Sequence, residues 1–155
     1  MFNLIGAWLW AHWPSFTITK DGIPYLTRFY VFLKDRVFGN IFVHFFHRSD
    51  MDIGTNGLGL LHNHPFRGTS ISFILSGGYR EERRAADGSV YSKLVKPFTF
   101  NVLREGDFHR VDLLDEKKGC WTIFVVGSRK NRTWGFWDRV TKEYIPFEQV
   151  DGAIE

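Results

Sequence analysis

The sequence predicts an all-β domain, an antiparallel sandwich or barrel preceded by one short helix. Short apolar runs separated by turn signals follow one another from residue 16 to residue 137, and this spacing is typical of such folds. Helical periodicity is almost confined to the first 13 residues. No internal repeat, low-complexity tract or linker divides the chain, so we expect residues 1–155 to form a single domain.

The first predicted element is a helix over residues 1–13. Phe2, Ile5, Trp8 and Leu9 recur at helical spacing, which indicates an amphipathic helix docked on the body of the domain. Because three tryptophans crowd this segment, docking on a membrane surface or a partner chain is the alternative. The segment is shorter than the roughly 20 residues of a membrane span and has no basic leader, so neither a span nor a signal peptide is expected.

The remaining elements are predicted to be short strands. Asp87-Gly88 is a typical turn for a hairpin between two of them. Phe98, Phe100 and Val102 alternate with polar residues, which predicts a strand whose apolar side chains face the core. The predicted strands, in order, span residues 16–19, 25–33, 41–46, 70–75, 79–83, 90–95, 98–103, 108–113, 121–126 and 133–137.

Composition excludes several classes of protein. The formal net charge is only +3, and basic residues alternate with acidic ones in Arg80–Arg84, so we expect a solvated strand face and no nucleic-acid partner. The basic stretch at residues 129–132 is interpreted as an exposed turn. Cys120 is the only cysteine, which excludes an intrachain disulfide and favours a reducing, cytoplasmic location. Its apolar surroundings predict a small buried side chain and not a nucleophile.

Three histidines are the candidate metal ligands. His62 and His64 are two residues apart, so on a strand both side chains leave the same face. His109 follows later, and from a neighbouring strand it would complete a facial triad with open positions. A histidine pair on a strand is commonly structural, but the third histidine favours a metal site.

The residues around these histidines resemble the cupin superfamily. His62-Asn63-His64, the apolar run 70–75 and Gly77 are similar to the first cupin motif, and residues 104–109 are similar to the second. The resemblance covers about residues 60–113. The His64-Pro65 pair and the flanking strands are similar, more narrowly, to small bacterial and phage cupins with an HxHP motif. The resemblance implies a double-stranded β-helix, or jelly-roll, barrel that holds one divalent metal ion, iron first and zinc, nickel or manganese as alternatives.

The chain departs from the family pattern at one ligand. The glutamate of the first motif should fall between Gly68 and Ser70, where no residue is acidic. Two repairs are open: three neutral imidazoles suffice, as in the cysteine-dioxygenase branch of cupins, or Glu81 reaches the metal. We favour three histidines, with Glu81 as a nearby base or as a partner of Arg104.

Strand parity suggests further site residues. Tyr79 and Ser70 are expected to supply hydroxyl groups, and Arg104 a fixed charge for a substrate carboxylate. We therefore name Tyr79, Glu81 and Arg104 as candidate catalytic residues. Of the two other histidines in the strand region, His44 is better placed than His47 to approach the site.

These features support a mononuclear non-haem metal enzyme, dioxygenase-like, acting on a small polar or anionic molecule. A Lewis-acid isomerase or hydrolase using the same centre is one alternative. A cupin that binds a small ligand without turnover is another, and an assembly protein that uses its N-terminal helix as the contact is a third. Membrane contact is not expected, and a homodimer is expected by analogy only.

Overall fold

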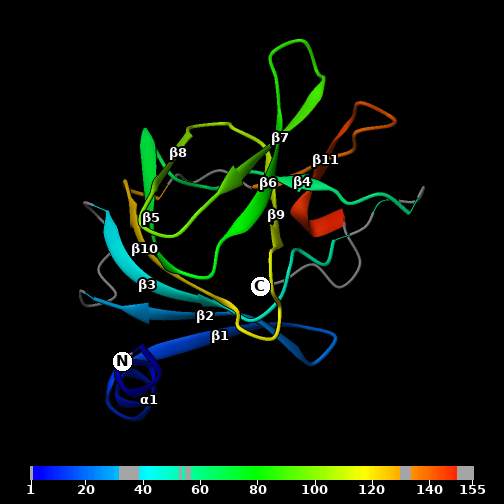
Figure 1. The fold of residues 1–155 in the computed structure, drawn as a ribbon. Helices are drawn as coiled ribbons and strands as arrows, with labels where there is room; N and C mark the ends of the chain where they lie inside the picture. The colour runs from blue at the N-terminus through cyan, green and yellow to red at the C-terminus, as the bar shows by residue number, and fades with distance from the viewer. Residues whose placement is uncertain (1, 32–38, 53, 55–56, 130–133, 150–155) are drawn as a thin grey trace.

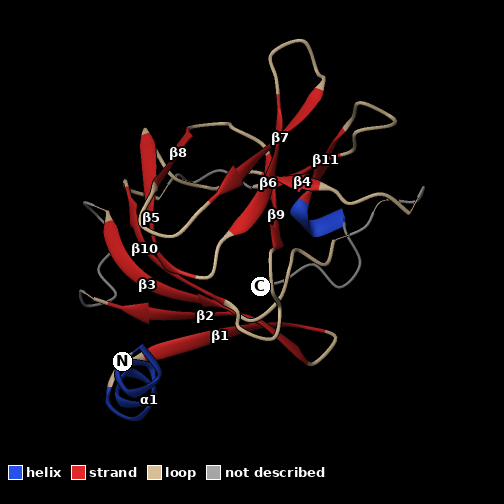
Figure 2. Cartoon of the chain, viewed as in Figure 1, coloured by secondary structure: helices blue, strands red, loops and turns tan. Residues whose placement is uncertain are grey.

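The computed structural model describes residues 2–31, 39–52, 54, 57–129 and 134–149. Within them, two six-stranded antiparallel sheets face each other and one helix lies outside the first sheet (Figures 1 and 2). The prediction of an all-β fold with a short N-terminal helix is confirmed. No helix in these described ranges is long and apolar enough to cross a membrane.

The first sheet carries the longer strands and the second carries the shorter ones. In spatial order the first consists of β1 (Ser15–Lys20), β2 (Ile23–Tyr30), β3 (Asn40–Phe46), β10 (Cys120–Val126), β5 (Thr69–Ser76) and β8 (Phe100–Arg104). The second consists of β12 (Tyr144–Pro146), β11 (Gly135–Trp137), β4 (Leu61–His62), β9 (His109–Leu113), β6 (Tyr79–Arg84) and β7 (Val90–Val95).

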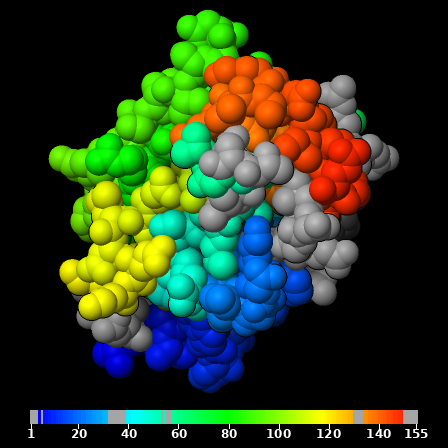
Figure 3. All heavy atoms as spheres, turned by 90° about the vertical axis from the view of Figure 1, so that its right-hand side faces the viewer, coloured from blue at the N-terminus to red at the C-terminus, as the bar shows by residue number. Residues whose placement is uncertain are grey.

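Two C-terminal elements were not expected from the sequence. These are strand β12, which pairs with β11 and extends the second sheet at its edge, and the 3-10 helix η1 (Phe147–Gln149), which follows it. Figure 3 shows the C-terminal residues, orange to red, at the upper right of this face of the molecule. Two predicted strands extend beyond the described residues. Positions 32–33 of the strand predicted over residues 25–33, and position 133 of the strand predicted over residues 133–137, lie outside them.

Helix α1 (Phe2–His12) docks on the first sheet, as predicted. Trp10 makes edge contacts with Phe29 and Trp121, with ring centroids 5.0 and 5.9 Å apart. Gly6 lies against Trp121, where a Cβ atom would be 3.0 Å from the indole ring. Of the residues predicted to face the body, Leu9 is half-buried and Trp8 is 53% exposed, and the side chains of Phe2 and Ile5 lie outside the described part of the chain. The contacts through Gly6 and Trp10 were not predicted.

The alternation in β8 runs opposite to the prediction. Phe98 and Phe100 are each 70% exposed, whereas Asn101 is 1% exposed. The reason is a buried polar network, because Asn101 donates to Glu81 Oε1 at 2.9 Å and accepts from Arg83 Nη2 at 2.9 Å. Satisfying these buried groups outweighs burial of the phenyl rings.

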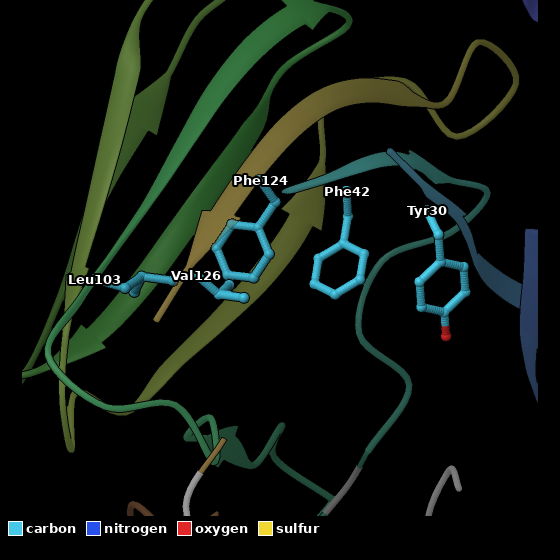
Figure 4. Close-up of a cluster of buried hydrophobic side chains, with 5 residues drawn as sticks. All are labelled: Tyr30, Phe42, Leu103, Phe124 and Val126. Atoms are coloured by element: carbon cyan, nitrogen blue, oxygen red, sulfur yellow. The ribbon is translucent and has the colours of Figure 1, made fainter. Parts of the chain in front are cut away.

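The inner face of the first sheet is aromatic. Figure 4 shows Phe124, Phe42 and Tyr30 in a row, all on the same side of strands β10, β3 and β2. Leu103 and Val126 complete this cluster. Together these side chains form one wall of the space between the sheets, and the histidines lie on the other side.

Candidate metal centre

The three histidines converge on the second sheet. His62 ends β4, His109 begins β9, and the two are direct partners in the antiparallel ladder. His64 lies two residues beyond β4. One ligand atom from each of the three side chains lies within 4.8 Å of the others. The local fold thus brings together residues that are up to 47 positions apart in the sequence.

The spacing of the ring nitrogens suits ligands of one ion. His64 Nε2 and His109 Nε2 are 2.8 Å apart. Two nitrogens that bind one ion at right angles, each at ~2.1 Å, are separated by ~3 Å. The ring of His62 is centred 4.6 Å from that of His109 and 5.0 Å from that of His64. The three rings are therefore arranged as neighbouring ligands would be.

Glu81 forms a hydrogen bond with the Nδ1 atom of His109. Glu81 is fully buried and lies on β6, and its Oε1 atom is 2.8 Å from His109 Nδ1. Arg83 Nε donates to the other carboxylate oxygen at 2.8 Å. Burial opposes the charged form, but the hydrogen bonds and charges of His109 and Arg83 outweigh it and hold the pKa of Glu81 far below its usual range. An anionic carboxylate only accepts hydrogen bonds, so His109 Nδ1 carries the proton and Nε2 faces the cluster.

Asp50 plays the corresponding part for His62. Its carboxylate is buried, and Oδ2 lies 3.4 Å from His62 Nδ1. The same oxygen accepts from the backbone N–H of Val111 at 2.7 Å, and Oδ1 accepts from the Tyr25 hydroxyl. Asp50 was not predicted as a site residue, because nothing in the local sequence distinguishes a loop aspartate that lies beside a histidine from one that forms a turn.

Burial keeps His62 and His64 in the neutral form that binds metals. Burial lowers the pKa of His62 to about 4 despite the opposing charge of Asp50. Burial, together with the neighbouring His109 and His62, places the pKa of His64 well below its usual value. Neutral imidazoles with available lone pairs are ligands for iron, zinc, nickel and copper alike. The donor set therefore fits a transition-metal ion, and its chemistry does not select one metal.

The other predicted site residues divide into two groups. Tyr79 lines the cavity between the sheets, and burial together with the charge of Glu81 raises the pKa of its hydroxyl. Ser70 is buried, but Ser72 is the β5 serine that lines the cavity. Strand parity predicted Ser70, which is one inward-facing position before the cavity-lining Ser72 on this strand.

Arg104 is not brought to the histidines. It ends β8 on the exposed face, and it is not among the residues that line the cavity. It shares the outward parity of Phe100, because Asn101 and Leu103 point inward. The basic partners of Glu81 are instead Arg83 and Lys93. The predicted role of Arg104 as a fixed charge for a substrate has no support in this position.

The histidines open into a cavity of about 400 Å³ between the two sheets. Its wall includes the half-buried Arg28 on β2 and the buried His44 on β3, whereas His47 lies outside it. Arg28 was missed by the sequence analysis. A signal for it exists, because Leu26, Arg28 and Tyr30 share one face of a strand and the charge interrupts an inward apolar series.

The comparisons with known proteins agree with this architecture. No protein-family model matches the sequence, and no curated protein matches it. The crystal structure of iron(II) HppE matches with a TM-score of 0.55 and 14% identity, covering 75% of this chain and 57% of that one. The E162A mutant of Bacillus subtilis oxalate decarboxylase OxdC matches with a TM-score of 0.54 and 11% identity, covering 77% of this chain and 28% of that one.

These likenesses define the class of fold. The neighbours are cupin-fold proteins, and the two facing antiparallel sheets are consistent with the jelly-roll barrel that the sequence predicts. This chain spans little more than half of the HppE chain. The class is therefore a cupin-fold protein with three histidines that could form a metal site.

Proposed function

We propose that this protein is a mononuclear metal enzyme that acts on a small polar or anionic molecule. One observation carries the proposal: the buried His109 and the half-buried His62 and His64, from two separate segments, place their ligand atoms within 4.8 Å of one another at the wall of a cavity. Two buried carboxylates stand behind two of the rings. This arrangement of a carboxylate behind a histidine is typical of metal sites, where it fixes the ring and its tautomer.

The residues have separate tasks in this proposal. His62, His64 and His109 hold the ion, and Glu81 and Asp50 orient two of them. A bound divalent ion would supply Lewis acidity or, if it is iron, the capacity to activate O₂. The fold neighbour that was crystallised with iron(II) supports the iron version, which makes a dioxygenase-like reaction the first candidate.

Tyr79 is the proposed proton donor at the cavity wall. Its raised pKa keeps the hydroxyl protonated at neutral pH. Asn101 Nδ2 donates to the Tyr79 oxygen at 3.0 Å, so the phenol's own proton is directed elsewhere. A hydroxyl held in this way can donate a hydrogen bond to an anionic group of a bound molecule.

The test is metal content together with oxygen uptake. Wild-type protein purified without chelators should contain close to one equivalent of iron or another transition metal by elemental analysis, and His64→Ala should lose most of it. His12→Ala is the matched control, because His12 is exposed at the end of α1. Substrate-dependent O₂ consumption would support the dioxygenase-like version. Metal that is equally abundant in wild type and His64→Ala, or absent from both folded proteins, would contradict the proposal.

A further inference from the structure

A polar row crosses the aromatic wall of the cavity. Arg28 is paired with His44 in the β2–β3 ladder, and His44 is paired with Thr122 in the β3–β10 ladder. The three side chains come from adjacent strands and all line the cavity. A cation, an imidazole and a hydroxyl therefore lie side by side on a surface that is otherwise made largely of phenyl rings (Figure 4).

Arg28 is held in a fixed orientation. Its Nε donates a hydrogen bond of 3.0 Å to His44 Nε2, and its guanidinium carbon lies 4.7 Å from the centre of the Phe42 ring. Burial and the charge of Arg28 lower the pKa of His44 well below its usual value, so His44 is neutral and its Nε2 lone pair accepts the hydrogen bond from Arg28. A guanidinium fixed by a hydrogen bond and by an aromatic face is preorganised for binding a carboxylate.

Thr122 points to a ligand independently of Arg28. The side chain is fully buried, and among the described residues its Oγ1 atom has no hydrogen-bond partner. Buried polar atoms are almost always partnered, so such an atom at the wall of a cavity indicates a group that the cavity receives. Asn40 Nδ2 is another atom of this kind, but Asn40 lies at the start of β3, four residues before His44.

The charges of the cavity favour an anion. Its two carboxylates are already engaged, Asp50 by Tyr25 and Val111 and Asp52 by Lys20 at 2.5 Å. Arg28 contributes a positive charge inside, and the ion proposed for the histidines would add two more. Of the two carboxylates only Asp52 is paired with a cation, so the negative charge of Asp50 remains, and Arg28, Arg129 and the proposed ion together outweigh it and favour a negatively charged guest.

Phe124 connects this row to the histidines. Its ring is centred 5.3 Å from the ring of His44 and 5.8 Å from the ring of His64. A small molecule lying against Phe124 can therefore touch both the polar row and the histidine cluster. Phe42 and Phe124, which are partners on adjacent strands, offer one continuous apolar surface to such a molecule.

We propose that the cavity takes a small carboxylate with an apolar or aromatic body, whose carboxylate binds Arg28 and accepts a hydrogen bond from Thr122 Oγ1. This inference rests on the proposed function and names the substrate class of the same cavity. Of the two arginines that line the cavity, only Arg28 belongs to the polar row. One guanidinium and one hydroxyl in that row match a monoanion better than a phosphate dianion, which commonly takes several cationic or N–H donors. The other end of the molecule then faces His62, His64 and His109.

The probe is benzoate, and benzamide is its neutral analogue. Binding is measured by isothermal titration calorimetry on protein stripped with a chelator and on metal-loaded protein, in a buffer without carboxylate or phosphate. Benzoate should bind and benzamide should not. Arg28→Gln should weaken benzoate binding by about 100-fold. Arg104→Gln is the matched control and should leave it unchanged, because Arg104 lies on the exposed face.

Thr122→Val distinguishes a binding role of Thr122 from a structural one, because the two roles predict opposite changes in the melting temperature. Valine has the shape of threonine but lacks the hydroxyl, so the ligand-free variant should melt at a higher temperature than wild type, because an orphaned buried oxygen is removed. The same variant should bind benzoate about tenfold more weakly. A Thr122→Val variant that melts lower and binds benzoate normally would overturn the proposal.

The remaining outcomes distinguish this inference from the proposed function. Equal binding of benzoate and benzamide, binding that survives Arg28→Gln, or tighter binding of inorganic phosphate than of benzoate would each overturn the carboxylate proposal, whatever the metal content. Benzoate binding that depends on Arg28 in a protein that holds no metal would support this inference while the proposed function fails. Full metal content without benzoate binding would support the proposed function and overturn this inference.

Discussion

Replacing Glu81 by glutamine should weaken both the fold and the metal centre. Glu81 is fully buried, and its two carboxylate oxygens accept from His109, Arg83 and Asn101. Glutamine keeps the shape but offers one acceptor oxygen and one donor NH₂ group. Whichever way the amide is turned, its NH₂ group faces a donor: Arg83 Nε on one side, or His109 Nδ1 and Asn101 Nδ2 on the other.

The expected cost follows from burial. The Arg83 side chain is only 11% exposed, and without the Glu81 charge its remaining carboxylate partner is the more distant Asp107 at 3.6 Å, so its charge is poorly compensated. Breaking a buried pair of this kind costs about 3 kcal/mol or more. For a domain of this size that corresponds to a fall of ~6–12 °C in the melting temperature. Loss of the carboxylate behind His109 should also weaken metal binding by roughly 10–100-fold.

Glu82→Gln is the matched control for this experiment. Glu82 is the next residue on β6, faces the other side of the strand, and pairs with Arg139 at a partly exposed position. Its replacement should cost about 1 kcal/mol or less. Stability is measured by urea unfolding and metal affinity by competition with a chromogenic chelator. If Glu81→Gln lost no more stability than Glu82→Gln and bound metal as tightly as wild type, the assigned role of Glu81 would be wrong.

Two further predictions concern titration and thiol chemistry. Because burial holds the pKa of His62 at about 4 in the fold, the unfolded chain takes up the proton first as the pH falls from about 6.5 toward 4, so metal-free protein should lose about 3 kcal/mol of stability over that range, measured by urea unfolding at each pH. An unfolding free energy that stays flat from pH 7 to pH 4 would contradict this. Burial also raises the pKa of the Cys120 thiol to about 11 and leaves it 0% exposed, so a thiol reagent should label it slowly in native protein and fast in urea; rapid native labelling would contradict the structure.

Much of the fold could be predicted because its signals are local. Alternating runs and turn residues indicated the strands, and the predicted strand over residues 90–95 coincides with β7 (Val90–Val95). The short strand β12 (Tyr144–Pro146) was missed, since three residues carry too little pattern to be recognised.

The candidate site was predictable only in its histidines. Motif spacing pointed to His62, His64 and His109, and the fold places them together. Asp50, Arg28 and Thr122 are assembled by sheet registers that no single segment encodes. The prediction put Arg104 on the same, inward face of the strand as Phe98 and Phe100. The polar network around Asn101 turns that residue inward instead, so Phe98, Phe100 and Arg104 face outward.

The inverted strand β8 has a consequence for how this gene can vary. At Asn101 nearly every substitution removes a partner from Glu81 and Arg83, so drift at this polar position should be purged. At Phe100, which is 70% exposed, hydrophilic replacements should be neutral for the fold. Selection should therefore conserve the amide of Asn101 and tolerate changes of the Phe100 ring, which is the opposite of what hydropathy alone leads one to expect.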